Sequence, residues 1–345
     1  MIKFLLKHNF HVLFVYILLC FPLFYFVYKF GVVLAGYEDA KSYFKLFGNL
    51  SSHDVPSPFN MRLLSPALIH ILHETGLFYN TECAFDAFPM YDKTYFFANV
   101  FYNFICVSLT SHSLYLAFTK LNFSKFNSFL AGLVFLLGFG TIFYLMMPGV
   151  DSISLLIFTW ILFFYLKRNY WIIPLLLILV FQREYYFLFF MLVALMDFFR
   201  FKKEKYYIHV FAIATLGWLT YFVLRKYVFF THHWHYQTNA NSLLNGLLHI
   251  EIDLVTMFRQ SFMTMNIYFI YLLVLAIKKY NDMKINTYNF ITTVLLFIQI
   301  TILSIATTSG NNNGRYFYFA TPYFLYLILS EVNSILRIEL NIETK

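Results

Sequence analysis

Long apolar runs separated by short polar segments dominate the 345-residue chain. A membrane-spanning helix needs about 20 predominantly apolar residues, and about ten runs approach that length. We therefore predict an all-α, polytopic transmembrane protein. Its predicted spans are at about 11–35, 94–118, 128–147, 150–166, 170–182, 184–200, 207–227, 263–277, 287–308 and 316–332. The first run lacks a small-residue cleavage site, so we expect a retained helix and not a signal peptide.

Three of the segments between these runs are long or unusually polar, at about 36–93, 228–262 and 309–315. Amphipathic stretches within the first two are typical of helices that lie in the membrane interface. These stretches are at about 38–50, 60–75 and 242–260. No internal repeat and no low-complexity linker divides the chain, which favours one integral-membrane domain over residues 1–345.

Composition excludes a soluble domain, because 60% of the residues are hydrophobic and only 12% are charged. An aromatic content of 23% suits lipid-facing surfaces and interfacial belts. The net charge of +8 does not indicate nucleic-acid binding, since the Lys and Arg residues lie in short loops beside predicted spans. There they orient the chain and meet anionic membrane lipids.

The loop charges also predict the topology. With a cytoplasmic N-terminus, most of the 25 Lys and Arg residues fall on the cytoplasmic side. The C-terminus then also lies in the cytoplasm. The opposite face is close to neutral and carries most of the ionisable residues at run boundaries, so we look for function there.

Three carboxylates on this outer face are candidates for chemistry. Glu38 and Asp39 directly follow the first run, where a membrane-boundary carboxylate can act as a general base. The alternative is that they only solvate the end of a helix. Asp151 follows a Pro-Gly turn, and it either supports a site or simply caps the next helix.

Cations on the same face could bind phosphate or carboxylate groups. Arg62 enters an apolar stretch between prolines, and Arg183 interrupts a long apolar run beside Glu184. Arg315 ends an Asn-rich turn that includes Asn313 and is followed by Tyr316, a pattern that fits sugar or phosphate binding. The alternatives are interfacial snorkelling for Arg62 and Arg315 and a local ion pair for Arg183 with Glu184.

His232, His233 and His235 form a cluster just after a predicted span. Their spacing could hold a divalent metal only with further ligands from elsewhere, and interfacial packing is the simpler interpretation. The sequence supports no definite cofactor. It also contains no nucleotide-binding Gly-rich loop, no zinc-protease motif and no hydrolase nucleophile elbow.

Four segments together resemble the GT-C superfamily of integral-membrane glycosyltransferases, in a compact bacterial form. They are Glu38-Asp39 with Ser42-Tyr43, the proline-flanked Arg62-Leu63-Leu64-Ser65-Pro66, Asp151 with the later Arg183-Glu184, and Asn313-Gly314-Arg315-Tyr316 with Pro322. We expect a compact form without the large soluble domain that follows the last span in several members. Acceptor recognition therefore cannot be carried over.

The resemblance implies a bacterial inner-membrane enzyme that uses a polyprenyl-phosphate sugar as donor. Its acceptor would be an extracytoplasmic glycan, lipid or protein, and transfer would invert the sugar configuration. Asp39 would be the catalytic base, with Glu38 as its substitute. The remaining candidates would bind substrate: Arg62, Asp151, Arg183, Glu184, Asn313, Arg315 and Tyr316.

Two other functions stay open, as does a purely structural role in the membrane, which would be favoured if the outer charges proved mutually paired and inaccessible. A polysaccharide polymerase or ligase acting on lipid-linked oligosaccharide would use the outer arginines without a catalytic carboxylate. A transporter or flippase of lipid-linked solutes would more often show repeats and polar groups near the membrane midplane.

Overall fold

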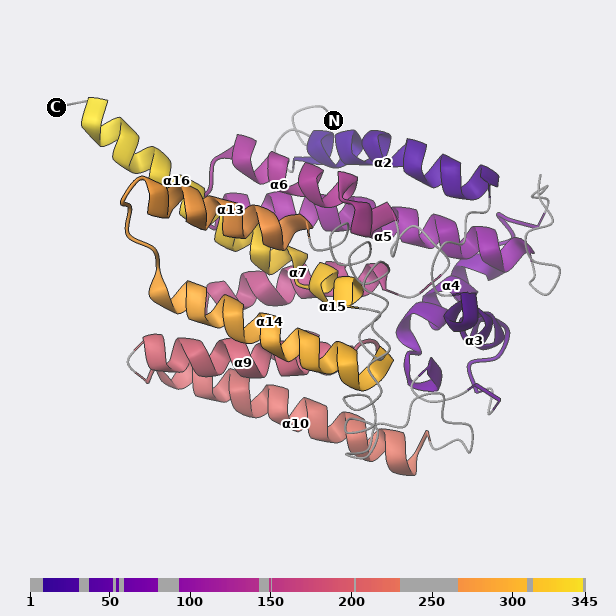
Figure 1. The fold of residues 1–345 in the computed structure, drawn as a ribbon. Helices are drawn as coiled ribbons and strands as arrows, with labels where there is room; N and C mark the ends of the chain where they lie inside the picture. Colours follow the sequence, from indigo (N-terminus) through magenta and orange to yellow (C-terminus); the bar gives the residue numbers. More distant parts are fainter. Residues whose placement is uncertain are drawn as a thin grey trace. The chain divides into compact units, whose positions relative to one another are not determined.

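The structure is a computed structural model that describes residues 9–30, 37–51, 54–55, 59–79, 93–142, 149, 151–201, 203–229, 266–308 and 313–343. All regular secondary structure in these ranges is helical, as predicted (Figure 1). The α-helices are α2 (Phe10–Phe30), α3 (Tyr37–Gly48), α4 (Leu64–Glu74), α5 (Lys93–Lys120), α6 (Lys125–Leu137), α7 (Ser152–Leu166), α8 (Ile172–Ile178), α9 (Tyr185–Arg200), α10 (Lys205–Tyr227), α13 (Asn266–Tyr280), α14 (Thr287–Thr308), α15 (Asn313–Phe319) and α16 (Thr321–Glu343). Two 3₁₀ turns are η1 (Phe59–Met61) and η3 (Leu179–Phe181).

The predicted number of spans is wrong. Within the described ranges three helices, not about ten, are long and apolar enough to cross a membrane: α2, α5 and α10. Several other predicted spans form shorter helices, such as the 15-residue α7 and the 13-residue α6. At 1.5 Å per residue, 15 residues cover only about 22 Å of the roughly 30 Å hydrocarbon layer.

Local sequence explains where the apolar runs break. The run at 170–182 forms the seven-residue α8, then tightens into η3 and ends at Gln182. The run at 316–332 is divided between α15 and α16, because Thr321-Pro322 starts a new helix after Ala320. Periodicity and hydropathy do not detect such breaks, since the residues on both sides are equally apolar.

The described residues group into two compact units. The first contains Met1–Ala117, Phe129–Phe187 and Leu216–His235. The second contains Phe118–Ser128, Leu188–Thr215 and Tyr236–Lys345. The expectation of a single domain stays a prediction.

In the first unit, α2 packs along α5 and α6 (Figure 1). Phe24 of α2 contacts Phe104 of α5, and the Tyr16 hydroxyl donates a 2.9 Å hydrogen bond to the Phe129 carbonyl of α6. The two short helices α3 and α4 lie where amphipathic stretches were predicted. His73 of α4 stacks on Tyr95 of α5, with ring centroids 3.7 Å apart.

Close contact among α2, α5 and α6 requires glycine at position 132. A Cβ atom there would overlap the Tyr16 hydroxyl and lie 2.6 Å from the Ser111 carbonyl oxygen. We expect Gly132→Ala to lower the free energy of unfolding by about 1–3 kcal/mol, because overpacking forces helices apart. Thermal unfolding of the purified protein measures this.

Gly48→Ala is the matched control, since a Cβ atom at Gly48 meets nothing within 4 Å. Adding Tyr16→Phe to Gly132→Ala removes one overlapping oxygen and should restore part of the loss. Equal melting temperatures for Gly132→Ala and Gly48→Ala would contradict this packing.

In the second unit, α13 runs along α16 (Figure 1). Lys278 of α13 and Glu331 of α16 form a buried ion pair, with Nζ 2.5 Å from Oε2. Ser334 accepts a second hydrogen bond from Lys278 at 2.9 Å, and Arg200 of α9 donates to Asn289 of α14 at 2.8 Å. These polar contacts join four helices at positions where the sequence indicated only loop charge.

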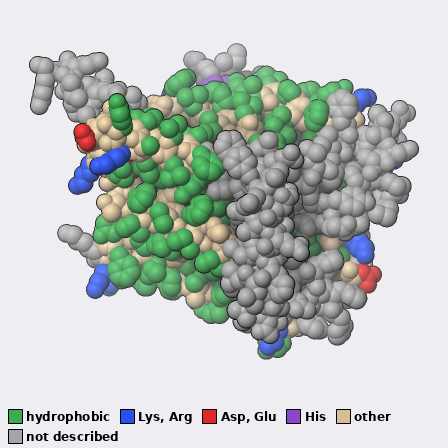
Figure 2. Space-filling model, in the orientation of Figure 1, with side chains coloured by type: hydrophobic (Ala, Val, Ile, Leu, Met, Phe, Trp, Pro, Cys, Tyr) green, Lys and Arg blue, Asp and Glu red, His purple; other side chains and the backbone are tan. Residues whose placement is uncertain are grey.

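Much of the described surface is apolar. Figure 2 shows hydrophobic side chains over most of the described face in view, with Lys and Arg at its margins. Exposed side chains on α10 include Leu216, Leu219 and Val223. By contrast α5 is largely buried and carries polar residues such as Asn99 and Asn103 inside the protein. Apolar surface of this extent is typical of helices that face lipid.

Candidate functional site

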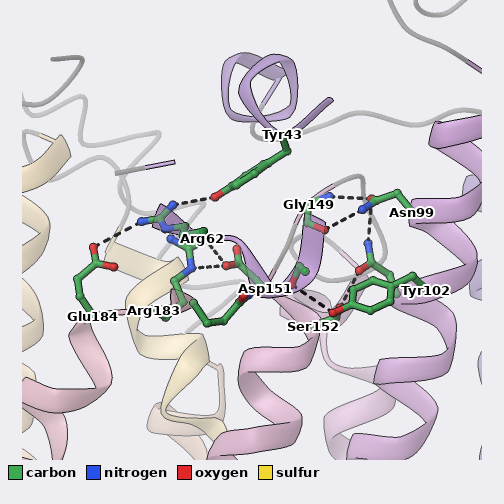
Figure 3. A network of polar contacts seen from close by, with 12 residues as sticks. Tyr43, Arg62, Asn99, Tyr102, Gly149, Asp151, Ser152, Arg183 and Glu184 are labelled. Atoms are coloured by element: carbon green, nitrogen blue, oxygen red, sulfur yellow. Dashed lines mark hydrogen bonds and ion pairs between the residues drawn. The ribbon is translucent and has the colours of Figure 1, made fainter. Parts of the chain in front are cut away.

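Arg62 is the centre of a polar network in the first unit (Figure 3). It lies between η1 and α4, and its side chain is buried, with only 7% of the residue exposed. Its Nη1 donates a 2.8 Å hydrogen bond to the hydroxyl of Tyr43 on α3. Its Nη2 lies 3.5 Å from Oε1 of Glu184, and its guanidinium carbon lies 5.4 Å from the ring centre of Phe59. The side chain is thus held in protein and does not snorkel.

Arg183 and Asp151 form a second ion pair in the same network (Figure 3). Both side chains are almost completely buried, with 6% and 2% exposed. Asp151 occupies the N-cap position of α7, as predicted, but its side chain makes no capping hydrogen bond to the helix. Its carboxylate pairs with Arg183 instead.

Arg183 and Glu184, neighbours in sequence, thus form ion pairs with partners far away in the chain. Arg183 pairs with Asp151 at the start of α7, and Glu184 pairs with Arg62, which lies between η1 and α4. Both carboxylates lie at helix N-termini, where the helix dipole stabilises negative charge. Four of the predicted site residues are therefore brought together.

Asparagine side chains of α5 contact Gly149 and Ser152, on either side of Asp151. Asn99 donates from Nδ2 to the Gly149 carbonyl at 3.0 Å and accepts from the Gly149 amide at 2.9 Å (Figure 3). Asn103 accepts a 2.7 Å hydrogen bond from the Ser152 hydroxyl. These contacts tie Gly149 and the first residue of α7 to α5.

We expect Asn99→Ala to lower the free energy of unfolding by about 1–3 kcal/mol, because both Gly149 backbone groups lose their partner. The loss is measured by thermal or denaturant unfolding of the purified protein. Asn281→Ala is the control, since Asn281 is exposed and bonds only within its own helix end. A difference below about 0.5 kcal/mol between the variants would contradict this role for Asn99.

Ser65 forms a second junction beside the site. Its hydroxyl accepts hydrogen bonds from Tyr102 of α5 at 3.2 Å and from Gln182 at 3.0 Å. Gln182 immediately precedes Arg183, so α4 and α5 together position the segment that carries the second ion pair. Ser65 thus links the start of α4 to α5 and to the residue before Arg183.

Glu184 is surrounded by positive charge. Burial tends to raise the pKa of its carboxyl group. The positive charges of Arg62, Arg183 and Arg225 lower this pKa, and the net result lies below the ordinary value. Glu184 is therefore ionised at neutral pH, and its ion pair is lost only as the pH falls through that lowered pKa.

Arg225 was not singled out by the sequence analysis. It lies in the last turn of α10, one turn after Tyr221, and only 5% of the residue is exposed. This end of α10 is tied to the segment before Arg62, because Asn60 donates a 2.9 Å hydrogen bond to the Phe229 carbonyl. A sequence signal did exist: a basic residue at the outer end of a predicted span, on the side where few are expected.

Other predicted residues are not part of this geometry. Tyr316 lies half-buried on α15, in the second unit. The side chains of Glu38, Asp39, Asn313 and Arg315, and all of His232, His233 and His235, lie outside the described residues.

The arrangement is suited to binding an anion. Arg62 uses Nη1 and Nη2 for Tyr43 and Glu184, while its buried Nε has no hydrogen-bond partner among the described residues. Aromatic side chains of Phe59 and Tyr43 contact each other beside it.

Within the described part of the chain, no cluster of His, Cys, Asp and Glu is arranged to hold a metal ion. Comparison of the chain with known protein families, curated proteins and solved structures finds no match.

Proposed function

We propose that this chain is a multi-pass membrane glycosyltransferase of the bacterial inner membrane. It moves a sugar from a polyprenyl-phosphate donor to an extracytoplasmic glycan, lipid or protein acceptor. The observation that carries the proposal is the buried Arg62, held by Tyr43 and Glu184 next to the Arg183–Asp151 pair. A guanidinium in such surroundings binds phosphate through paired hydrogen bonds.

The apolar surface supports a lipid-borne substrate. The helices α2 and α10 are long and apolar and expose most of their length, so a polyprenyl tail can lie against them in the bilayer. Arg225 lies in the last turn of α10, and Glu184 lies just before α9. The charged headgroup would bind at these helix ends while the tail stays in lipid.

The reaction is a single displacement at the anomeric carbon. The acceptor hydroxyl oxygen attacks C1 of the sugar as its proton passes to the Asp39 carboxylate, with Glu38 as substitute. The bond between C1 and the phosphate oxygen breaks, and its electron pair leaves with polyprenyl phosphate. Arg62 and Arg183 would stabilise the charge on the leaving phosphate. Asp151 and Glu184 would hold the arginines or orient sugar hydroxyls.

An assay of the purified protein in lipid nanodiscs tests the proposal. Polyprenyl-phosphate sugars of several kinds are supplied with mixed glycan, lipid and peptide acceptors, and release of polyprenyl phosphate is measured. We expect release from at least one donor, dependent on an acceptor. No release from any donor, by protein that is folded and inserted, would contradict it.

A further inference from the structure

Two buried polar atoms of the site lack a hydrogen-bond partner among the described residues. They are Nε of Arg62 and Oδ1 of Asn60. Each residue is only 7% exposed, so both side chains lie almost wholly inside the protein. A buried polar atom that bonds to nothing is costly, and in most proteins such an atom binds an ordered water or a ligand. These two atoms therefore indicate that a small polar group binds here.

The Asn60 atom is an acceptor. Nδ2 of Asn60 donates a 2.9 Å hydrogen bond to the Phe229 carbonyl, just after the end of α10. Because a carbonyl oxygen only accepts, the amide nitrogen must face it, and Oδ1 is the atom that remains. Oδ1 can likewise only accept. A group that binds to it must therefore supply an O–H or N–H.

The Arg62 atom is a donor. Nη1 bonds to Tyr43 and Nη2 pairs with Glu184, so Nε is the guanidinium nitrogen without a partner among the described residues (Figure 3). A guanidinium has no acceptor, so its ligand must supply an oxygen that accepts. Solvent reaches this part of the network, because 26% of the Glu184 side chain is exposed. A ligand can therefore approach Arg62 from the Glu184 side.

Both residues belong to one tight turn. Asn60 lies in η1, and Arg62 directly follows it, with its amide bonded to the Phe59 carbonyl at 3.0 Å. At about 2 Å per residue, the two positions are separated by about 4 Å along the turn axis. Both side chains face the last part of α10, since Asn60 bonds to Phe229 and Arg62 lies within electrostatic reach of Tyr221. One small ligand can therefore contact both.

A sugar linked to phosphate satisfies both atoms at once. The phosphate diester of a lipid-linked sugar carries acceptor oxygens but no proton, so by itself it can bind Arg62 and not Asn60. The donor nearest to that phosphate is the substituent on C2, the carbon next to the anomeric C1. We propose that Oδ1 of Asn60 accepts a hydrogen bond from an O–H or N–H on C2 of the lipid-linked sugar, while Nε of Arg62 donates to its phosphate. This inference rests on the proposed function, which supplies a sugar phosphate as the ligand.

The proposal makes the site selective for the C2 substituent. A sugar with a hydroxyl or an acetamido group on C2 should bind about 10-fold tighter than its 2-deoxy form, the size of one hydrogen bond. A 2-deoxy sugar leaves Oδ1 of Asn60 buried without a partner, and sites of this kind reject analogues that lack the bonding group. Asn60→Leu keeps a side chain of similar size but removes the acceptor. It should abolish the preference while sugar-free polyprenyl phosphate still binds.

The experiment is equilibrium binding to the whole chain in nanodiscs. The probes are polyprenyl-phosphate glucose, mannose, N-acetylglucosamine and 2-deoxyglucose, with sugar-free polyprenyl phosphate as the baseline. Asn49→Leu is the matched control variant, since Asn49 is exposed in the same unit and bonds to the nearby Ser51. It should keep the wild-type preference. The comparison of the four sugars on the unaltered protein needs no variant, so it decides the matter if Asn60→Leu fails to fold.

The expected result is tighter binding of at least one C2-substituted sugar than of 2-deoxyglucose, with the difference lost in Asn60→Leu. Equal binding of all four sugars would overturn the proposal and assign Oδ1 of Asn60 to an ordered water only. A preference that survives in Asn60→Leu would also overturn it, because a residue that only maintained the fold would weaken every probe and keep the preference. Failure of all four sugar lipids to bind would overturn it as well.

The outcome for the proposed function is separate. Transfer in the nanodisc assay without any preference at C2 would keep the glycosyltransferase and end the role of Asn60. Binding that depends on C2 and on Asn60, with no transfer to any acceptor, would leave this inference intact and end the proposed function.

Discussion

Arg62→Ala should reduce sugar transfer by about 100- to 1,000-fold, the usual loss when one preorganised donor to developing charge is removed. The buried guanidinium would be replaced by a methyl group, so the leaving phosphate would lose its central cation. Arg62→Lys should recover only part of the rate, because an ammonium cannot contact Tyr43 and Glu184 at the observed separations together. Initial rates of polyprenyl phosphate release measure the effect.

Asp39→Asn, assayed beside Arg62→Ala, separates the two enzyme functions. A glycosyltransferase with a carboxylate base should lose transfer in both variants, with expression and membrane insertion unchanged. A polymerase or ligase that relies on arginines alone should lose it only in Arg62→Ala. Full activity of Arg62→Ala would remove the observation on which the proposed function depends.

Asp151→Asn should lower the free energy of unfolding by about 3–5 kcal/mol, because it leaves the Arg183 charge buried without its carboxylate. The side chains have almost the same shape, so the loss reports charge and not packing. With both residues almost completely buried, water cannot compensate. Denaturant unfolding of the purified protein, followed by circular dichroism, gives the value.

Replacing both partners tests the cause of that loss. Asp151→Leu combined with Arg183→Met removes both charges together and should recover most of the stability. The same double variant should abolish the phosphate binding proposed for Arg183. Asp54→Asn is the control, since Asp54 is exposed, and should change stability by less than about 0.5 kcal/mol. Equal losses in Asp151→Asn and in the double variant would show that the pair does not account for the stability.

The order of residues along the chain was enough to predict that the secondary structure is helical and that two short helices, α3 and α4, follow the first apolar run. Apolar periodicity extends over only a few helical turns, so a helix can be recognised from its own residues. The same reasoning picked out Arg62, Asp151, Arg183 and Glu184, since an ionisable residue beside a long apolar run is costly wherever it packs.

Helix lengths and breaks were less predictable. Whether an apolar run continues for 20 residues or stops after seven, as α8 does, depends on what packs against it. Hydropathy treats Leu176 and Leu177 alike, yet the first is buried and the second is 52% exposed. A hydropathy average over a window of residues does not depend on burial, so it cannot distinguish the two leucines.

Ion-pair partners depended on packing alone. Arg183 and Glu184 are adjacent in the chain, and adjacency suggested a pair, but each has a partner contributed by a distant segment. Asn99 escaped notice because a lone asparagine in a predicted span does not indicate its partners. Arg225 carried a signal, a basic residue at the end of a predicted span, but its neighbours could not be predicted. Composition and local order therefore identify the residues that are too costly to bury alone. The folded arrangement of α5, α7, α9 and α10 decides their partners, because burial and charge pairing act through space and not along the chain.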